Sequence, residues 1–161
     1  MPFSPYRRNE SYRVHVLELK KVSYHWRDTL LLLYVLEGEI LVTIDDETHS
    51  RKQGQVDIIN PGELRAFEGM KKNRVLFLEL QPDFFADYYE EAPRTYYYVD
   101  ERDSHEDSEK YRRLKSYMAK LSYEYFHPGE DSSFVTKELL VELMYHLLNQ
   151  FHYLYYEQEE L

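Results

Sequence analysis

The chain has 161 residues, of which 43% are hydrophobic, so it is long enough to fold as one domain around its own core. Its 30 acidic residues outnumber its 20 basic ones, and the formal net charge of −10 argues against direct binding to DNA phosphates. The lack of cysteine excludes disulfides, thiolate nucleophiles and cysteine-ligated zinc.

The N-terminal segment 1–13 carries charge but no apolar centre, so it is not a secretory signal. We interpret it as an N-terminal arm, with Tyr6, Arg7 and Arg8 as potential contacts; the alternative is a frayed terminus. The apolar run 30–36 ends at Glu37 and Gly38, well short of the roughly eighteen residues that a membrane span needs. We therefore expect a cytoplasmic protein with no membrane partner.

Short apolar runs alternate with turn residues from Tyr12 to Leu80. Predicted strands cover 14–19, 29–36, 39–44, 56–59 and 74–80, and turn chemistry falls at 37–38, 45–46, 53–54, 61–62 and 68–69. Strands at this spacing predict a closed or sandwiched antiparallel sheet.

The second half of the chain is predicted to be helical. A short helix is expected around 83–91, followed by a break at Pro93 and a solvated connection over 100–108. Two longer helices are expected over 106–126 and 133–156, with His127-Pro128-Gly129 between them.

One face of the last predicted helix is apolar. It carries residues at three- and four-residue steps: Leu140, Met144, Leu147, Phe151 and Leu154. The preceding helix can cover part of this face through Leu114, Tyr117, Met118 and Leu121, which gives an antiparallel helical pair. Periodicity leaves open whether the rest is a dimer interface or internal core.

Two motifs carry a family resemblance. The first is His25-Trp26-Arg27 followed by LLLYVLEGE, and the second runs from Gln53-Gly54 through Asn60-Pro61-Gly62-Glu63 to Arg65. Their order and separation resemble the cupin barrel in the sensor half of AraC family transcription regulators. The resemblance implies a mainly β fold with α: a cupin-like jelly-roll barrel followed by two C-terminal antiparallel helices.

The same resemblance implies a division of the chain and a set of partners. We expect an arm over 1–13, a barrel over 14–98 and a helical dimerisation segment over 99–161. A homodimer is expected, and DNA contact is expected only through a helix-turn-helix domain downstream of Leu161.

The metal positions of metal-binding cupins fall on His25, Arg27, Leu31 and Arg65 in this chain. A protonated guanidinium and an aliphatic side chain offer no lone pair to a cation. We therefore expect no metal, no cofactor and no catalytic residue.

Strand parity predicts a ligand site instead. If residues 25–35 form one strand, His25, Arg27, Thr29, Leu31, Leu33 and Val35 share a face, and the barrel assignment makes that face interior. Arg65 and Phe67 are expected to face in from a neighbouring strand. Buried arginines need partners, so we hypothesise that Arg27 and Arg65 bind an oxygen-rich effector such as a sugar or sugar acid. The alternative is that they pair with Asp57, Glu39 or Glu79 and bind nothing.

Trp26, the only tryptophan, could stack on a sugar, although alternation points it outward, toward a packing role beneath the helices. The histidines form no metal or proton-transfer group: His146 and His152 lie almost opposite on a helix, while His49, His105 and His127 fall in predicted turns or linkers.

Three functions are compatible with these residues. The preferred one is a non-enzymatic ligand-sensing and dimerisation domain of an AraC-like regulator, since it accounts for the altered metal positions, the acidic charge and the trailing helices together. The alternatives are a small cupin enzyme, such as an isomerase or dioxygenase with an unusual metal ligand set, and a cupin module that only assembles subunits.

Overall fold

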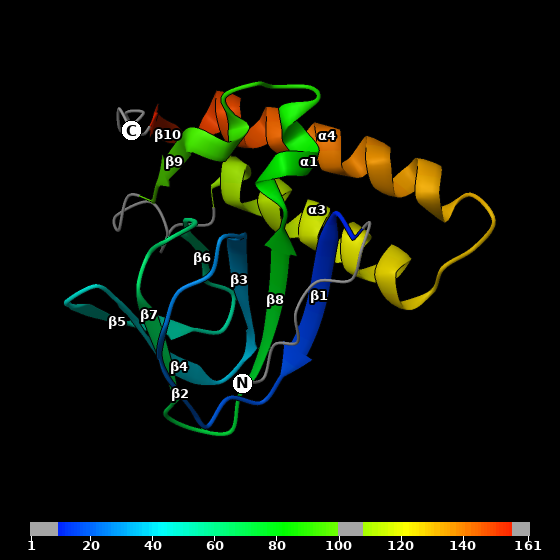
Figure 1. The fold of residues 1–161 in the computed structure, drawn as a ribbon. Coiled ribbons are helices and arrows are strands. Elements are labelled where there is room, and N and C mark those ends of the chain that lie inside the picture. The colour runs from blue at the N-terminus through cyan, green and yellow to red at the C-terminus, as the bar shows by residue number, and fades with distance from the viewer. Residues whose placement is uncertain (1–9, 100–107, 156–161) are drawn as a thin grey trace. The chain divides into compact units, whose positions relative to one another are not determined.

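The computed structural model describes residues 10–99 and 108–155, so the predicted arm contacts Tyr6, Arg7 and Arg8 lie outside the described residues, as does His105. The chain divides into two compact units, Met1–Gln81 and Pro82–Leu161 (Figure 1). The expected boundaries at 13/14 and 98/99 stay a prediction.

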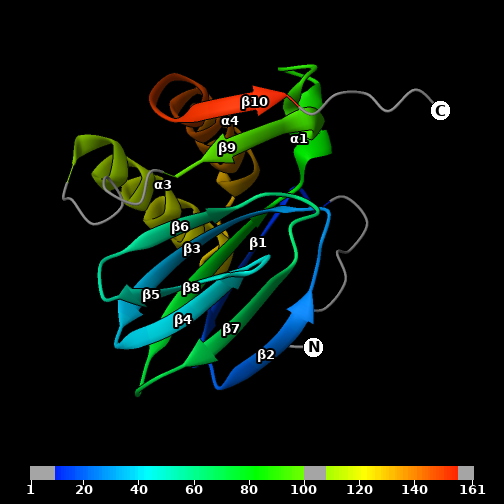
Figure 2. The ribbon, with the colours of Figure 1, turned by 90° about the vertical axis from the view of Figure 1, so that its left-hand side faces the viewer.

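The first unit consists of antiparallel strands in two sheets. In chain order the strands are β1 (Tyr12–Leu17), β2 (Lys21–His25), β3 (Leu30–Glu37), β4 (Glu39–Ile44), β5 (Glu47–Lys52), β6 (Val56–Ile59), β7 (Arg65–Gly69) and β8 (Arg74–Leu80). One sheet has the order β1-β8-β3-β6 and the other β2-β7-β4-β5, and Figure 2 shows the strands of the two sheets facing each other. The predicted antiparallel barrel is therefore confirmed.

The inner faces of the two sheets enclose the core of this unit. Its buried members are Leu19, Leu31, Leu33, Val35, Ile40, Val42, Ile59, Phe67, Val75 and Phe77. They alternate along their strands with residues of the opposite face, as a pleated strand requires. Burying each such side chain stabilises the fold by roughly 1.5–3 kcal/mol. The predicted inward direction of Leu31, Leu33, Val35 and Phe67 is confirmed.

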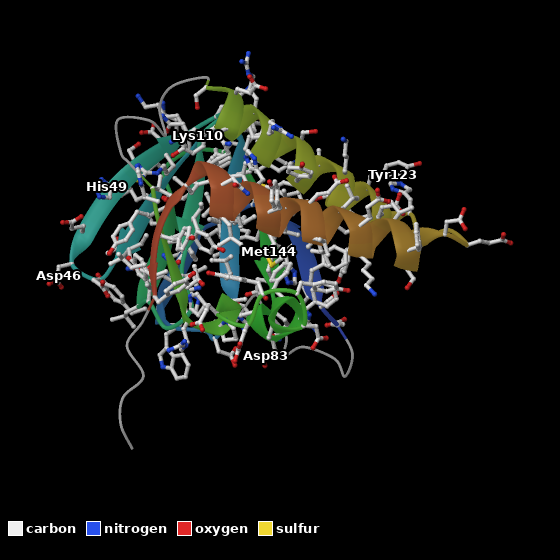
Figure 3. All side chains as sticks on the ribbon, turned by 90° about the horizontal axis from the view of Figure 1, so that it is seen from above. Asp46, His49, Asp83, Lys110, Tyr123 and Met144 are labelled. Carbon is white, nitrogen blue, oxygen red and sulfur yellow. The ribbon has the colours of Figure 1, made fainter. Side chains whose placement is uncertain are left out.

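Two strands of this first unit were not expected from the sequence. β2 and β5 are rich in polar residues and half-exposed, so their apolar alternation is weak. His49, which was assigned to a turn, lies on β5, and Figure 3 labels it beyond the β4–β5 turn that carries Asp46. That turn itself is confirmed, since Asp45 has a positive φ of 54°.

The second unit contains two long helices and a two-stranded sheet. Its elements are α1 (Pro82–Ala86), a 3₁₀ turn (Ala92–Arg94), β9 (Thr95–Tyr98), α3 (Glu109–Phe126), α4 (Ser132–Gln150) and β10 (His152–Tyr155). The helices are antiparallel: His146 Nε2 donates to the Lys110 carbonyl at 2.8 Å, while Ser132 Oγ donates to Glu124 Oε2 at 2.9 Å at the other end. Lys110 and Tyr123 mark opposite ends of α3 in Figure 3.

The last predicted helix is too long. It ends at Gln150, and Phe151 turns the backbone into an extended conformation that lets β10 pair with β9. Leu154 therefore lies opposite Tyr96 on a strand and is 58% exposed, so it does not belong to the helical face. The other four members, Leu140, Met144, Leu147 and Phe151, are buried within the single chain. That burial fits the internal-core alternative, and their dimer role stays a prediction.

Two glycines of the barrel provide a test of the turn geometry. Gly38 and Gly54 both have positive φ, 81° and 89°, which L side chains adopt at a cost of about 1–2 kcal/mol. A Cβ at Gly38 would also collide with the Lys72 carbonyl, whereas a Cβ at Gly54 meets nothing within 4 Å. We expect Gly38→Ala to lower the unfolding free energy by a further ~1–3 kcal/mol beyond Gly54→Ala. Urea unfolding of both variants measures the difference, and equal midpoints would contradict it.

Candidate ligand site at one end of the barrel

The site begins where two distant segments are joined by one hydrogen bond. The Gly62 N–H donates to the Arg27 carbonyl at 2.8 Å, which joins the turn before β7 to the connection after β2. Within the turn, the Asn60 backbone N–H and Nδ2 both donate to Glu63 Oε1, at 2.9 and 3.0 Å. Gly62 adopts a positive φ of 80°, which its lack of a Cβ permits. The two motifs singled out in the sequence therefore meet in space.

Arg65 lies directly after this turn, on β7 opposite His25, and is 0% exposed. Its Nε donates to the Glu63 carbonyl at 2.9 Å and its Nη2 to the Asn60 carbonyl at 2.8 Å. Its Nη1 is buried and has no hydrogen-bond partner within the described part of the chain. Burial lowers the pKa of Arg65 to about 10, so the side chain stays a cation at neutral pH. One buried N–H group of a charged fork is thus left unsatisfied.

Arg27 forms an ion pair with Glu79 of β8. Its Nε lies 2.6 Å from Glu79 Oε1, and its Nη2 donates to Oε2 at 3.2 Å. Burial raises the pKa of Glu79, and the Arg27 guanidinium opposes that rise. Glu79 is one of the partners considered for the arginines in the absence of a ligand, and the structure shows this pairing for Arg27 alone.

A third guanidinium lies beside Glu79. Arg13 on β1 is the register partner of Glu79 and forms an ion pair with Glu10 at 2.7 Å. Sequence reasoning missed Arg13 and His15, although both alternate with Val14 and Val16 along β1. The alternation of polar and apolar residues along this strand is the signal that could have identified them.

The predicted strand over residues 25–35 is interrupted. His25 ends β2 opposite Arg65 in one sheet, and Leu30 begins β3 opposite Leu80 in the other, so residues 26–29 connect the two sheets. The chain leaves one sheet for the other here because β2 and β3 pair with different strands. Thr29 Oγ1, in this connection, is buried without a hydrogen-bond partner among the described residues.

The remaining predicted site residues differ in how deeply they are buried. His25 is half-buried, donates from Nδ1 to the Ser23 carbonyl at 2.9 Å, and meets Phe67 edge-on at 6.1 Å. Leu31 and Phe67 are packed in the core. Trp26 is 65% exposed, so the expected packing role beneath the helices is wrong.

Neither groove described here is lined by the buried arginines. One, of about 450 Å³, lies on the outward face of the sheet β2-β7-β4-β5 and is lined by residues such as Ser23, Tyr24 and Thr43. The other, of about 340 Å³, lies between α3 and α4, with Tyr123 and Leu139 in its walls.

No group of three or more His, Cys, Asp or Glu side chains among the described residues is arranged to hold a metal ion. None of the helices described is both long and apolar enough to cross a bilayer.

The paired sheets and the helical pair define a cupin-like barrel domain with trailing helices, as the sequence predicted. The sequence model of the family described as the AraC-like ligand binding domain matches residues 17–148, well over half of the chain. The chain belongs to this family.

Curated relatives include uncharacterized HTH-type transcriptional regulators of Staphylococcus aureus. The regulator of strain MSSA476 is 20% identical over 120 residues, which cover 74% of this chain and 16% of that protein. The regulator of strain COL is 19% identical over 122 residues, covering 76% and 16%. The chain thus spans about a sixth of the length of these relatives.

Similar solved structures include a cupin-2 domain protein from Shewanella frigidimarina, 17% identical with a TM-score of 0.42, covering 50% of this chain and 82% of that one. The Cnp3 cupin domain of Schizosaccharomyces pombe is also 17% identical, with a TM-score of 0.46, and covers 53% and 67%.

The electrostatics of the site predict how His25 affects acid stability. Burial lowers the pKa of His25, and Arg65 and Arg27 lower it further against the raising effect of the Ser23 hydrogen bond. The unfolded chain, with a histidine pKa of about 6.5, therefore takes up the proton first as the pH falls, and stability is lost below that pH. We expect the Tm of His25→Gln to fall less between pH 7.5 and pH 5.5 than that of the unsubstituted chain, as a pH series of thermal melts measures.

The control for this prediction is His152→Gln, which changes an exposed histidine in the second unit. Its Tm should follow the unsubstituted chain across the series. A His25→Gln curve parallel to that of the unsubstituted chain would show that His25 titrates alike in the folded and unfolded states.

Proposed function

We propose that this chain is the ligand-sensing domain of a DNA-binding transcription regulator and that its effector is a sugar or a related oxygen-rich small molecule. The family match and the HTH-type relatives support the regulatory role. The observation that carries the ligand site is the buried Arg65 fork, one of whose N–H groups has no partner in the described chain. His25, Arg27, Leu31, Phe67 and Trp26 complete the proposed site.

The physical reason is the free energy of an unsatisfied buried donor. Leaving a buried hydrogen-bonding group without a partner costs about 1–3 kcal/mol, and more when the group is charged. A ligand oxygen at Arg65 Nη1 would recover that free energy. Thr29 Oγ1 is a second buried atom that a ligand hydroxyl could satisfy.

The regulatory part of the proposal requires two states with different affinity for the effector. The site lies where residues 26–29 join the two sheets, so occupancy of the site can bias how the sheets are joined. We further propose that the N-terminal arm responds to the effector and that the helical segment mediates homodimerisation. The exposed side chains Tyr123, Phe134 and Tyr145 are available for this, whereas four members of the predicted stripe are buried within the chain.

DNA contact belongs, in this proposal, to a helix-turn-helix domain outside the 161 residues, because the formal net charge of the chain is −10. Such a regulator acts in the cytoplasm. The enzyme alternative lacks a donor set at the cupin metal positions, where Arg27, Leu31 and Arg65 stand.

A thermal-shift screen with neutral sugars and uronic acids tests the ligand site. A ligand at about a hundred times its Kd stabilises the folded state by about 2.7 kcal/mol. For a domain of this size that corresponds to a Tm rise of roughly 5–10 °C. We expect Arg65→Gln to abolish the rise, because the unpaired donor is removed.

Arg51→Gln is the matched control. Arg51 is equally buried but paired, with Nε 2.9 Å from Asp57 Oδ2. It lies opposite Ile40 on β4, four residues from Ile44, which faces Arg65, so the two arginines are separated by about 13 Å along the strand. Its ligand response should persist. A rise that survives Arg27→Ala combined with Arg65→Gln would refute the proposed site.

A further inference from the structure

At this end of the barrel, guanidinium groups outnumber deeply buried carboxylates. Three guanidiniums, those of Arg13, Arg27 and Arg65, surround a single deeply buried carboxylate, Glu79, which is 1% exposed. The two other carboxylates nearby are less buried and already engaged. Glu10 pairs with Arg13, and Glu63 accepts two hydrogen bonds from Asn60.

The contact between Arg27 and Glu79 has the form of ligand recognition. Arg27 Nη2 donates to Glu79 Oε2 at 3.2 Å, and Nε lies 2.6 Å from Oε1 as an ion-pair contact whose geometry is not that of a hydrogen bond. Arginine binds the carboxylate of a small molecule through the same guanidinium nitrogens. Glu79 therefore occupies on Arg27 the position that a ligand carboxylate would take, while Arg65 Nη1 lies buried and unpaired in the described chain.

We propose that the effector carries a carboxylate, that this group replaces Glu79 on Arg27, and that the effector also accepts a hydrogen bond from Arg65 Nη1. The inference rests on the proposed function and narrows its ligand class from oxygen-rich molecules in general to organic anions. Glu79 is not left without a counter-ion by the exchange. Arg13, which lies opposite Glu79 in the register of β1 and β8, already acts on it electrostatically.

Charge balance within the site favours an anionic effector over a neutral sugar. A hydroxyl that displaced Glu79 would leave the Arg27 guanidinium without a negative partner in a site of low dielectric, which is strongly unfavourable. A carboxylate can take up the contacts that Glu79 makes and supplies the negative charge that Arg27 needs once Glu79 has left it. Binding is thus an exchange of one carboxylate for another.

The test uses matched pairs of probes on the full chain, each carboxylate beside its neutral counterpart: galacturonate with galactose, glucuronate with glucose, and benzoate with benzyl alcohol. We expect at least one carboxylate to give a saturable thermal shift that its neutral counterpart does not give. We also expect Arg27→Gln to abolish the shift and Arg51→Gln to retain it.

Glu79 variants test the exchange itself. Glu79→Gln removes the competing charge, and Glu79→Asp keeps the charge but shortens its reach to Arg27. If either folds, as judged by a cooperative thermal melt, its Kd for the responding carboxylate should be several-fold lower than that of the unsubstituted chain. An unchanged or higher Kd in a folded variant overturns the exchange.

The outcomes separate this inference from the function on which it rests. A neutral probe that shifts the Tm as much as its carboxylate partner, with dependence on Arg65, refutes the anion class and leaves the proposed sensing site intact. If no probe of either kind produces a shift, the proposed function and this inference both fail.

Discussion

This end of the barrel depends on one constraint: the Arg65 guanidinium is enclosed by protein and must find its hydrogen bonds there. Two of them go to the carbonyls of Asn60 and Glu63, so the turn between β6 and β7 must present those oxygens inward. The left-handed Gly62 and the double hydrogen bond from Asn60 to Glu63 hold the turn in the required shape. The local backbone is thus arranged around a single side chain.

The same barrel holds a second buried arginine that is satisfied differently. Arg51 pairs with Asp57 through Nε and Oδ2 and donates from Nη1 to the Ser50 carbonyl. Arg65, by contrast, donates its two hydrogen bonds to the backbone carbonyls of Glu63 and Asn60 and not to a carboxylate. Carbonyls orient a guanidinium without neutralising it. Arg51 therefore has the character of a structural ion pair, whereas Arg65 keeps its charge available at the centre of the site.

Sequence patterns predicted those elements whose pattern is local. The apolar runs in β3 and β8 and the turn glycines made the barrel recognisable, and the Pro61-Gly62 turn placed Arg65 correctly on an inward-facing strand. β2 and β5 escaped detection because their polar, half-exposed residues lack alternation. Leu154 was placed on a helix because its own periodicity does not show that it pairs with Tyr96, 58 residues earlier, on a strand.

The residues of the site could be named from the sequence, but the strand pairing that brings them together could not. Arg27 and Glu79 are 52 positions apart, and which carboxylate pairs with which arginine follows from the register of β1, β8 and β3 rather than from any motif. The break between β2 and β3 likewise depends on which strands each one pairs with. Parity along a supposed single strand nevertheless gave the correct inward side for Leu31 and Leu33.

Arg27 is held by two different contacts, one through its backbone and one through its side chain. Its backbone is anchored to Gly62 by a hydrogen bond that no ligand need disturb, while its side chain is anchored to β8 through a carboxylate. Release of the second anchor alone leaves the first as a pivot. Arg27 therefore has one contact that a ligand could exchange and one that would keep residues 26–29 attached to the turn before β7.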